Sequence, residues 1–442
     1  MALLYTINAY EVSFEQAMKN KEIEDTINQF SDLKLGFEKS RPISISFRKF
    51  KNIRPDWNIF PEKLEPFFQD SKNVASYSNG NLSIGEENLS KSKIPVLNDD
   101  IAQLAKKQSI SDCKVLIKPY IGYDLFKPFN GTIPLMSEDL LNTPLPCFEY
   151  MMDWETTHSH DNKQYGQNYK YVIISARHHI IDMAMTLFDY NKPRHHKWNC
   201  VLLKGKYIVI SMDISTNRKT NMIDPSKMSL MDQKRSNSGF EFENLLTGVK
   251  KNSNVSNDDG NIGNTIIPSY TFSIVENKLD EDILLLLRSE MDAYNNITKS
   301  YSELKCYGPL SMGNVHHRHK LLKTWIQTQL VPDCDVIIGT RDNYSGLLID
   351  INRYSRKEFY QKLNNRNSTL SRKYNLNVAK EWTKHCVRSI VKLIDMSITK
   401  EKFEDIVSSA QPFQLIIDNK RNIAIKRLQR IPPNLHIPKK YL

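Results

Sequence analysis

Short apolar runs alternate with amphipathic stretches along the chain, and this alternation predicts both strands and helices. Short runs of β-branched and leucine residues are typical of buried strands. Such runs cover residues 170–175, 200–203, 207–211, 283–287, 335–339 and 346–350. From His319 to Leu330 and from Val378 to Ile394, apolar residues instead recur every three or four positions, which indicates helices. The mixed order of strands and helices predicts an α/β or α+β fold with substantial mixed sheets.

Three polar stretches interrupt this pattern, at residues 71–98, 214–238 and 249–264. They are rich in Ser, Asn, Gly and Lys, a composition typical of loops. The chain has 442 residues, of which 40% are hydrophobic, and this is enough for a large core in one domain or two. We interpret the polar stretches as flexible loops or insertions on one folded unit, so residues 1–442 are predicted to form a single domain.

Two charged triplets follow the apolar run at residues 283–287. Glu290 and Asp292 flank Met291, and Glu303 and Lys305 flank a leucine in the same way. In a strand, residues two positions apart share a face, so the charged residues of each triplet point one way and the apolar residue faces the core. Residues 294–296, which read Tyr-Asn-Asn, offer turn chemistry between the triplets. The pattern predicts a β-hairpin whose tip region holds three carboxylates and one ammonium group.

These charges indicate a metal site. Carboxylates that sit together repel one another and raise each other's pKa unless a cation is present. Hard divalent ions such as Mg²⁺ prefer oxygen ligands and remove this repulsion. Carboxylates, a metal ion and a nearby lysine are the working parts of a nuclease. The alternative is an ordinary solvated strand face, on which such triplets are common.

Composition narrows the class of partner and of environment. The net charge of +11 favours an anionic partner, with nucleic acid first, although a solvated basic surface is the alternative. The six cysteines form no Cys-x-x-Cys pair, which is the usage of a reduced intracellular protein. No apolar run is long enough to cross a membrane. We therefore expect no membrane partner and a cytoplasmic location, with the nucleus as the alternative.

Two further motifs lie on either side of the triplets. Residues 238–243 read Ser-Gly-Phe-Glu-Phe-Glu, and residues 318–327 read Arg-His-Lys-Leu-Leu-Lys-Thr-Trp-Ile-Gln. With the triplets, this order resembles the DXO family of eukaryotic decapping exoribonucleases. In that family an arginine precedes a Gly-apolar-x-apolar-Glu motif, then Glu-apolar-Asp, Glu-apolar-Lys and a helix that carries a glutamine. Strong similarity covers residues 170–350, and the long polar loops suggest a fungal-type member.

The resemblance implies a single α+β domain with mixed sheets flanked by helices and a PD-(D/E)XK-like nuclease core. It implies an RNA 5′-end hydrolase that cleaves the phosphodiester after the first nucleotide and releases an intact cap. The caps would be guanosine caps, incompletely methylated caps and NAD-type caps. It also implies 5′→3′ degradation of 5′-monophosphate RNA. The expected cofactor is Mg²⁺, for which Mn²⁺ can substitute, and the expected partner is the RNA 5′ end. No protein partner is evident.

The resemblance also assigns roles to individual residues. The expected metal ligands are Glu243, Glu290, Asp292, Glu303 and the main-chain carbonyl of Leu304. The same four carboxylates and Lys305 form the catalytic set, in which Lys305 orients water or neutralises the scissile phosphate. Arg177, Glu290, Lys305 and Gln327 are expected to bind substrate. The alternative for Arg177 is a surface ion pair, and for Lys320 and Lys323, on the same helix stripe as Gln327, a solvated face.

The chain departs from the family pattern at two places. Arg177 follows Ser-Ala rather than the usual Trp before the family arginine, so only the arginine itself matches. Glu241 stands where the family often has lysine, which places a further negative charge near Glu243. Two other functions stay open at this point: a nuclease of the same fold that acts on DNA ends, and a non-catalytic RNA-binding partner of another nuclease.

Overall fold

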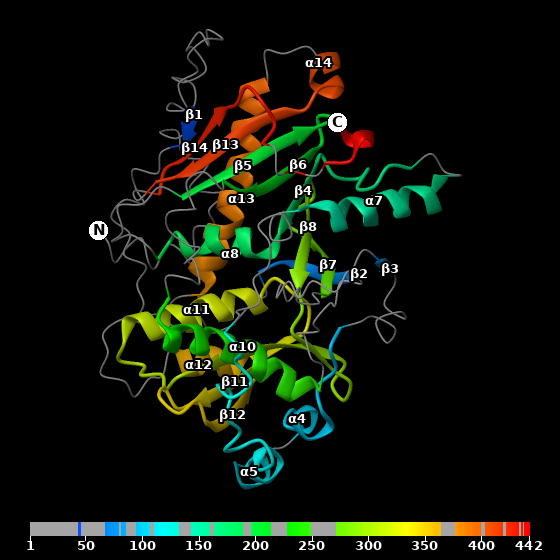
Figure 1. The fold of residues 1–442 in the computed structure, drawn as a ribbon. Coiled ribbons are helices and arrows are strands. Elements are labelled where there is room, and N and C mark those ends of the chain that lie inside the picture. Colours follow the sequence, from blue (N-terminus) through cyan, green and yellow to red (C-terminus); the bar gives the residue numbers. More distant parts are fainter. Residues whose placement is uncertain are drawn as a thin grey trace, which may run out of the picture.

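The structure is a computed structural model of the 442-residue chain. It describes residues 43–45, 67–78, 81–84, 94–106, 110–131, 143–159, 163–188, 196–213, 228–248, 271–363, 376–398, 403–418, 421–432, 435 and 437–442. Two β-sheets with helices around them form the architecture (Figure 1). No helix in these described ranges is both long and apolar enough to cross a membrane.

The larger sheet has ten strands in the order β1-β14-β13-β5-β6-β4-β8-β7-β2-β3. In chain order these are Ile43–Ile45 (β1), Gln69–Ser78 (β2), Asn81–Ile84 (β3), Tyr171–Ala176 (β4), His196–Leu203 (β5), Tyr207–Met212 (β6), Thr271–Lys278 (β7), Ile283–Glu290 (β8), Gln411–Ile417 (β13) and Ile423–Arg427 (β14). Strand β4 lies in the centre and pairs in parallel with both β6 and β8, whereas the outer pairs are antiparallel. The sheet is therefore mixed.

The smaller sheet has four strands in the order β12-β11-β10-β9. They are Ala293–Asn295 (β9), Ser300–Tyr307 (β10), Cys334–Arg341 (β11) and Leu348–Tyr354 (β12). Strands β10 and β11 pair in parallel through a helical crossover, and the other two pairs are antiparallel. That crossover is helix α11, Val315–Thr328, whose first turn is capped by the side chain of Asn314.

The remaining helices are Asp99–Gln103 (α4), Ile110–Ile117 (α5), Leu145–Thr157 (α7), Arg177–Met185 (α8), Leu230–Thr247 (α10), Arg356–Leu363 (α12), Leu376–Ile398 (α13) and Phe403–Ser408 (α14), with a short 3₁₀ turn at Lys439–Tyr441 (η5). Figure 1 shows α8 and α11 between the large sheet and strands β11 and β12. Helix α10 begins at the Ser229 cap and ends at Gly248, which has a φ of 68°.

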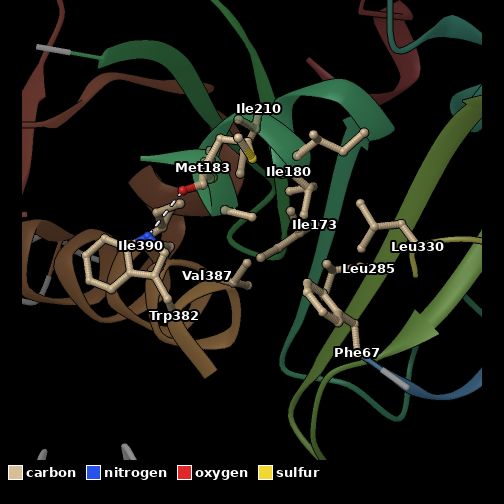
Figure 2. Close-up of a cluster of buried hydrophobic side chains, with 14 of the residues drawn as sticks. Phe67, Ile173, Ile180, Met183, Ile210, Leu285, Leu330, Trp382, Val387 and Ile390 are labelled. Atoms are coloured by element: carbon tan, nitrogen blue, oxygen red, sulfur yellow. Dashed lines mark hydrogen bonds between the residues drawn. The ribbon is translucent and has the colours of Figure 1, made fainter. Parts of the chain in front are cut away.

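Alternating side chains of the central strands fill two cores, one on each face of the large sheet. Ile173 belongs to the core that also includes α8, α11 and α13, whereas its neighbours Val172 and Ile174 pack on the α7 side. Figure 2 shows Trp382 of α13 in the first core, where its indole nitrogen donates to the Met183 carbonyl at 3.2 Å. A third core joins α4, α5 and α10 to the small sheet.

Most of the predicted elements are confirmed, and two loop predictions are partly wrong. The strand runs correspond to β4, β5, β6, β8, β11 and β12, and the two helices to α11 and α13. Within the predicted loop 71–98, however, β2 pairs with β3 and with β7, so its polar residues lie in an edge hairpin. Within 214–238, residues from Leu230 onward form α10. The predicted loop 249–264 lies outside the described residues.

Candidate active site

The two charged triplets lie where the two sheets meet. The predicted hairpin between them is wrong, because the strands that carry the triplets belong to different sheets. Glu290 ends β8 in the large sheet, whereas Glu303 and Lys305 lie on β10 in the small one. The actual hairpin is β9–β10, in which Ala293 pairs with Ser302. The chain crosses from one sheet to the other at Met291 and Asp292. The polar positions nevertheless converge, because β8 leads directly into β9.

The two faces of β10 are covered by different helices. Leu304 is 1% exposed and packs in the third core with Phe242 of α10. On the opposite face, the hydroxyls of Tyr307 and Thr324 of α11 are 3.0 Å apart, and Gln327 of α11 donates to Glu303. The alternation of strand side chains therefore points Glu303, Lys305 and Tyr307 toward α11, as predicted for the two charged residues.

One side of β10 is open at the level of these residues. In the part of the chain that the structure describes, β9 pairs only with residues 300–302 of β10. Beyond that point the Leu304 backbone nitrogen donates to Asp292 Oδ2 at 2.9 Å. Asp292 thus takes the position of a neighbouring strand and holds its carboxylate beside Glu303 and Lys305.

Four charged groups at this edge form a continuous chain of ion pairs, from Asp292 through Lys305 and Glu303 to Arg177. Lys305 Nζ lies 3.3 Å from Asp292 Oδ2 and contacts Glu303 Oε1. The other oxygen of Glu303 lies 3.2 Å from Arg177 Nη1. Arg177 also donates from Nη2 to the Glu290 main-chain carbonyl at 2.8 Å. Arg177 is 5% exposed, so its ion pair is buried, and the surface ion pair considered from the sequence is wrong.

The pKa values in the network follow from burial and from the neighbouring charges. Burial raises the pKa of Glu303, and the Asp292 charge raises it further, although Lys305 and Arg177 partly offset both effects. Burial opposes the charged form of Lys305, but Asp292 and Glu303 outweigh it and raise the lysine pKa well above its usual range. Lys305 is therefore a permanent ammonium group, and Glu303 is a carboxylate that holds a proton more readily than usual.

Glu243 and Glu290 complete the predicted set from two other elements. Glu243 lies on α10, and its charge is a minor contribution to the raised pKa of Lys305. Glu290 lies at the end of β8, where its main-chain carbonyl accepts from Arg177 and its charge acts on Arg288. Direct contacts thus join Arg177, Asp292, Glu303, Lys305 and Gln327, whereas the roles of the Glu243 and Glu290 side chains stay predictions. Lys323 on α11 instead pairs with Asp182 at 2.9 Å and is half-exposed, which fits the solvated-face alternative.

The donor set suits a hard divalent cation. Mg²⁺ typically binds through one or two carboxylates, waters and substrate phosphates. Asp292 and Glu303 supply two such carboxylates, and their mutual repulsion shows that a positive charge stabilises them together. Across the described residues, no group of three or more acidic, His or Cys side chains is close enough to bind an ion without rearrangement.

Some residues of the site escaped prediction. Tyr307 continues the alternation of Glu303 and Lys305, and this period-two signal was available in the sequence. His178 and His179 follow Arg177 on α8. His179 is fully buried, and burial lowers the pKa of His178 to about 3, with Arg288 as the next cause. Burial also lowers the pKa of His179 well below its usual range, so both imidazoles are neutral.

Comparison with known proteins identifies the family. The sequence model of RAI1-like PD-(D/E)XK nucleases matches residues 106–441. The chain belongs to the RAI1-like PD-(D/E)XK nuclease family. It is therefore a nuclease, and hence a hydrolase, and the family resemblance and the α+β fold predicted from the sequence are both confirmed.

Two relatives align with this nuclease over most of its length. Decapping and exoribonuclease protein 1 of Saccharomyces cerevisiae is 34% identical over 413 residues, which are 91% of this chain and 87% of the relative. The protein of the same name from Kluyveromyces lactis is 28% identical over 396 residues, 88% of this chain and 89% of the relative.

Solved structures show the same fold at lower identity. Dxo1 of Kluyveromyces lactis in complex with manganese gives a TM-score of 0.62 at 23% identity and covers 89% of this nuclease and 99% of that chain. Rai1 of Candida albicans in complex with pU5-Mn²⁺ gives a TM-score of 0.54 at 17% identity and covers 81% of this nuclease and 90% of that chain. These similarities establish the architecture in which the charged network lies.

Proposed function

We propose that this nuclease acts on RNA 5′ ends in two ways: it removes intact caps, and it degrades 5′-monophosphate RNA in the 5′→3′ direction. Two relatives that align over most of the chain are decapping and exoribonuclease proteins. The observation that carries the proposal is the buried network of Asp292, Glu303 and Lys305 at the open edge of β10. A carboxylate pair beside a fixed ammonium group is suited to stabilising a phosphate that gains negative charge.

Each side chain has a place in the hydrolysis of the phosphodiester. Asp292 and Glu303 would hold the divalent cation, which supplies charge neutralisation of the scissile phosphate and activation of water. Lys305 orients the attacking water or neutralises the phosphate, because its raised pKa keeps it charged at any working pH. Gln327 holds Glu303 in place and can hydrogen-bond the same phosphate or water.

Arg177 has a positioning role in addition to its predicted contact with substrate. Its guanidinium joins Glu303 to the Glu290 main chain and so ties the small sheet to the end of β8. A planar guanidinium makes such paired contacts with fixed geometry, which a lysine does not reproduce. The relative position of the two carboxylate-bearing segments therefore depends on Arg177.

One site accounts for both activities. Cleavage after the first nucleotide is the same bond-breaking step whether the 5′ end carries a cap or a phosphate, and only the group beyond that bond differs. The proposal includes guanosine caps, incompletely methylated caps and NAD-type caps as substrates. It also includes Mg²⁺ as the cofactor, with Mn²⁺ as a substitute, because the ligands are oxygens that both ions accept.

The direct test is incubation of the purified protein with a panel of 5′-capped RNAs in MgCl₂, MnCl₂ or EDTA. Mass spectrometry of the released small molecule should identify an intact cap, and the remaining RNA should carry a 5′-monophosphate. A matched DNA oligonucleotide is the specificity control, and the Asp292→Ala variant is the control for contaminating nucleases. Cleavage of DNA in preference to RNA would indicate a DNA-end nuclease. No cleavage of any RNA across the metal titration would indicate a non-catalytic RNA-binding protein.

A further inference from the structure

Gly239 lies in the interior of α10, where glycine has no conformational advantage. Glycine inside a helix destabilises it by about 0.5–1 kcal/mol relative to alanine, because the unfolded chain loses more freedom on folding. Among the helices that the structure describes, only α10 contains an internal glycine. The backbone of Gly239 does not have the positive φ that would require glycine. Its presence therefore needs another explanation.

Packing within the protein does not supply that explanation. A Cβ added at Gly339 would lie 2.4 Å from the ring of Phe242, and one added at Gly308 would lie 2.0 Å from Asn343, so both sites require glycine for close packing. A Cβ added at Gly239 meets no atom of the described residues within 4 Å. Gly239 is nevertheless only partly exposed, so it borders open space that the surrounding chain partly encloses.

The open space adjoins the active site. Gly239 precedes Glu243 by one helical turn, and residues four apart lie on the same helix face, about 6 Å apart along the axis. Glu243 in turn lies close enough to Lys305 to raise its pKa. The neighbouring Ser238 is fixed by the Nε group of Arg341 at 2.8 Å, which anchors this part of α10 against the small sheet.

Arg235 lies one helical turn before Gly239, toward the N-terminus, on the same face of α10. Its Nη1 group pairs with Asp232 at 3.0 Å, and its Nη2 group donates to the Asn343 carbonyl at 3.3 Å. The Arg235 side chain is nevertheless 36% exposed. A guanidinium that is held in place and still reaches the surface can bind a further anion. Arg235, Gly239 and Glu243 thus form a line that leads to the catalytic network.

We propose that the open space beside Gly239 receives the sugar-phosphate backbone of the single-stranded RNA substrate, and that Arg235 binds one of its phosphates. Glycine allows a ligand to approach a helix more closely than any other residue does, which outweighs its cost to helix stability. The inference rests on the proposed function, and it adds the path that the strand follows along α10 before it reaches Glu243.

The test uses substitutions at Gly239 that improve the helix but fill the space. Gly239→Ala and Gly239→Leu should melt at or above the wild-type temperature, because both residues are better helix formers and their Cβ atom meets no atom of the described residues. Both should nevertheless lose activity on 5′-monophosphate RNA. We expect kcat/KM to decrease about tenfold or more for Gly239→Leu and less for Gly239→Ala, because small displacements of a bound substrate are costly. Ser236→Ala, an exposed position on α10, controls for stabilisation of the helix itself.

A binding measurement separates this inference from the proposed function. Fluorescence anisotropy with 5′-phosphorylated RNA in EDTA should show weaker binding by Gly239→Leu. Arg235→Gln should reduce the slope of log K against log salt by about 0.7, the value for one phosphate contact with a single strand. If the wild type binds RNA without cleaving it, the proposed function fails and anisotropy still decides the inference. Wild-type binding and turnover in Gly239→Leu, equal losses in Ser236→Ala, or no RNA binding by the wild type would each overturn it.

Discussion

The two sheets of this nuclease differ in what their buried strands contain. The central strands of the large sheet are apolar on both faces, and β4 is buried at all six positions. The small sheet has four strands against ten, and its strand β10 places Glu303 and Lys305 among buried residues. The large sheet therefore provides a rigid support, and the small sheet carries the chemistry at its open edge. The network forms where β8 delivers Glu290 and Asp292 to that edge.

Two buried glutamates show the same contrast. Glu276 on β7 of the large sheet accepts from the Tyr165 hydroxyl at 2.6 Å and the Tyr150 hydroxyl at 3.1 Å, and it pairs with Lys72 at 2.8 Å. Glu303 on β10 faces a second carboxylate and two cations. Glu276 is satisfied by donors of its own, whereas Glu303 lies in a repulsive pair that favours an added cation. Burial of a carboxylate alone does not mark a catalytic site.

The largest expected effect is loss of activity at Glu303. Glu303→Gln keeps the shape of the side chain but removes the charge that binds the cation and positions Lys305. We expect kcat for both decapping and 5′→3′ degradation to decrease by about 10³-fold, on the scale of losing a principal electrostatic contact in the transition state. Single-turnover assays on capped and monophosphorylated RNA measure this. Loss of one activity with retention of the other would contradict a single shared site.

The matched change in the large sheet acts on stability instead. Leu285→Ala on β8 removes a fully buried side chain from the first core (Figure 2). We expect the free energy of unfolding to decrease by about 2–5 kcal/mol, the usual cost of such a cavity. Below the melting temperature, kcat should stay within about twofold of wild type, a difference of under 0.5 kcal/mol. A large loss of kcat in the folded variant would show that the large sheet does more than support the site.

A smaller effect on stability is expected at the other buried glutamate. Glu276→Ala leaves the Tyr165 hydroxyl buried without its acceptor, and such a group typically costs about 1–3 kcal/mol. Urea unfolding followed by fluorescence measures the change in the free energy of unfolding. RNA cleavage should be unchanged at a temperature where the variant is folded. If Glu276→Ala abolished cleavage as Glu303→Gln does, the distinction between the two carboxylates would be wrong.

The smallest and most specific effect concerns pH. The pKa of Glu303 is raised, so protons compete with the cation for this carboxylate at a higher pH than for an ordinary glutamate. The affinity for Mn²⁺ should therefore decrease as the pH falls through the raised value. In Asp292→Asn the repulsion that contributes to the raised pKa is absent, so the decrease should move to lower pH. Calorimetric titrations between about pH 5 and pH 8 cover the range in which a raised glutamate pKa is found. An unchanged pH dependence would argue against coupling of the two carboxylates.

Local pattern was sufficient to predict most elements and the faces of the two charged triplets. The apolar runs identified the central strands, and the period-two alternation placed Met291 and Leu304 in the core and Glu303 with Lys305 on one face. The predicted loops failed where polar residues form structure. Strands β2 and β3 are edge strands, which need few apolar residues, and the start of α10 is a polar helix that is stabilised by its Ser229 cap.

The local sequence pattern could not predict which strands pair with one another. The sequence permits a simple hairpin that joins Glu290 to Glu303, but the chain leaves the large sheet after Glu290 and enters the small sheet at Ala293. Which strand pairs with β10 depends on contacts with β11 and α11, which are formed by residues much further along the chain. The ion pair between Arg177 and Glu303 has the same origin, because it joins the start of α8 to the small sheet.

The sequence by itself determined which residues carry charge, which strands are buried and which family motifs are present, because side-chain chemistry and periodicity are local properties. Only the tertiary structure decided that Asp292 replaces a missing strand, that Arg177 bridges Glu303 to the Glu290 main chain, and that open space lies beside Gly239. The physical reason is that edges, ion pairs and open spaces are made by segments that are distant in sequence, and their positions follow from the packing of the whole fold.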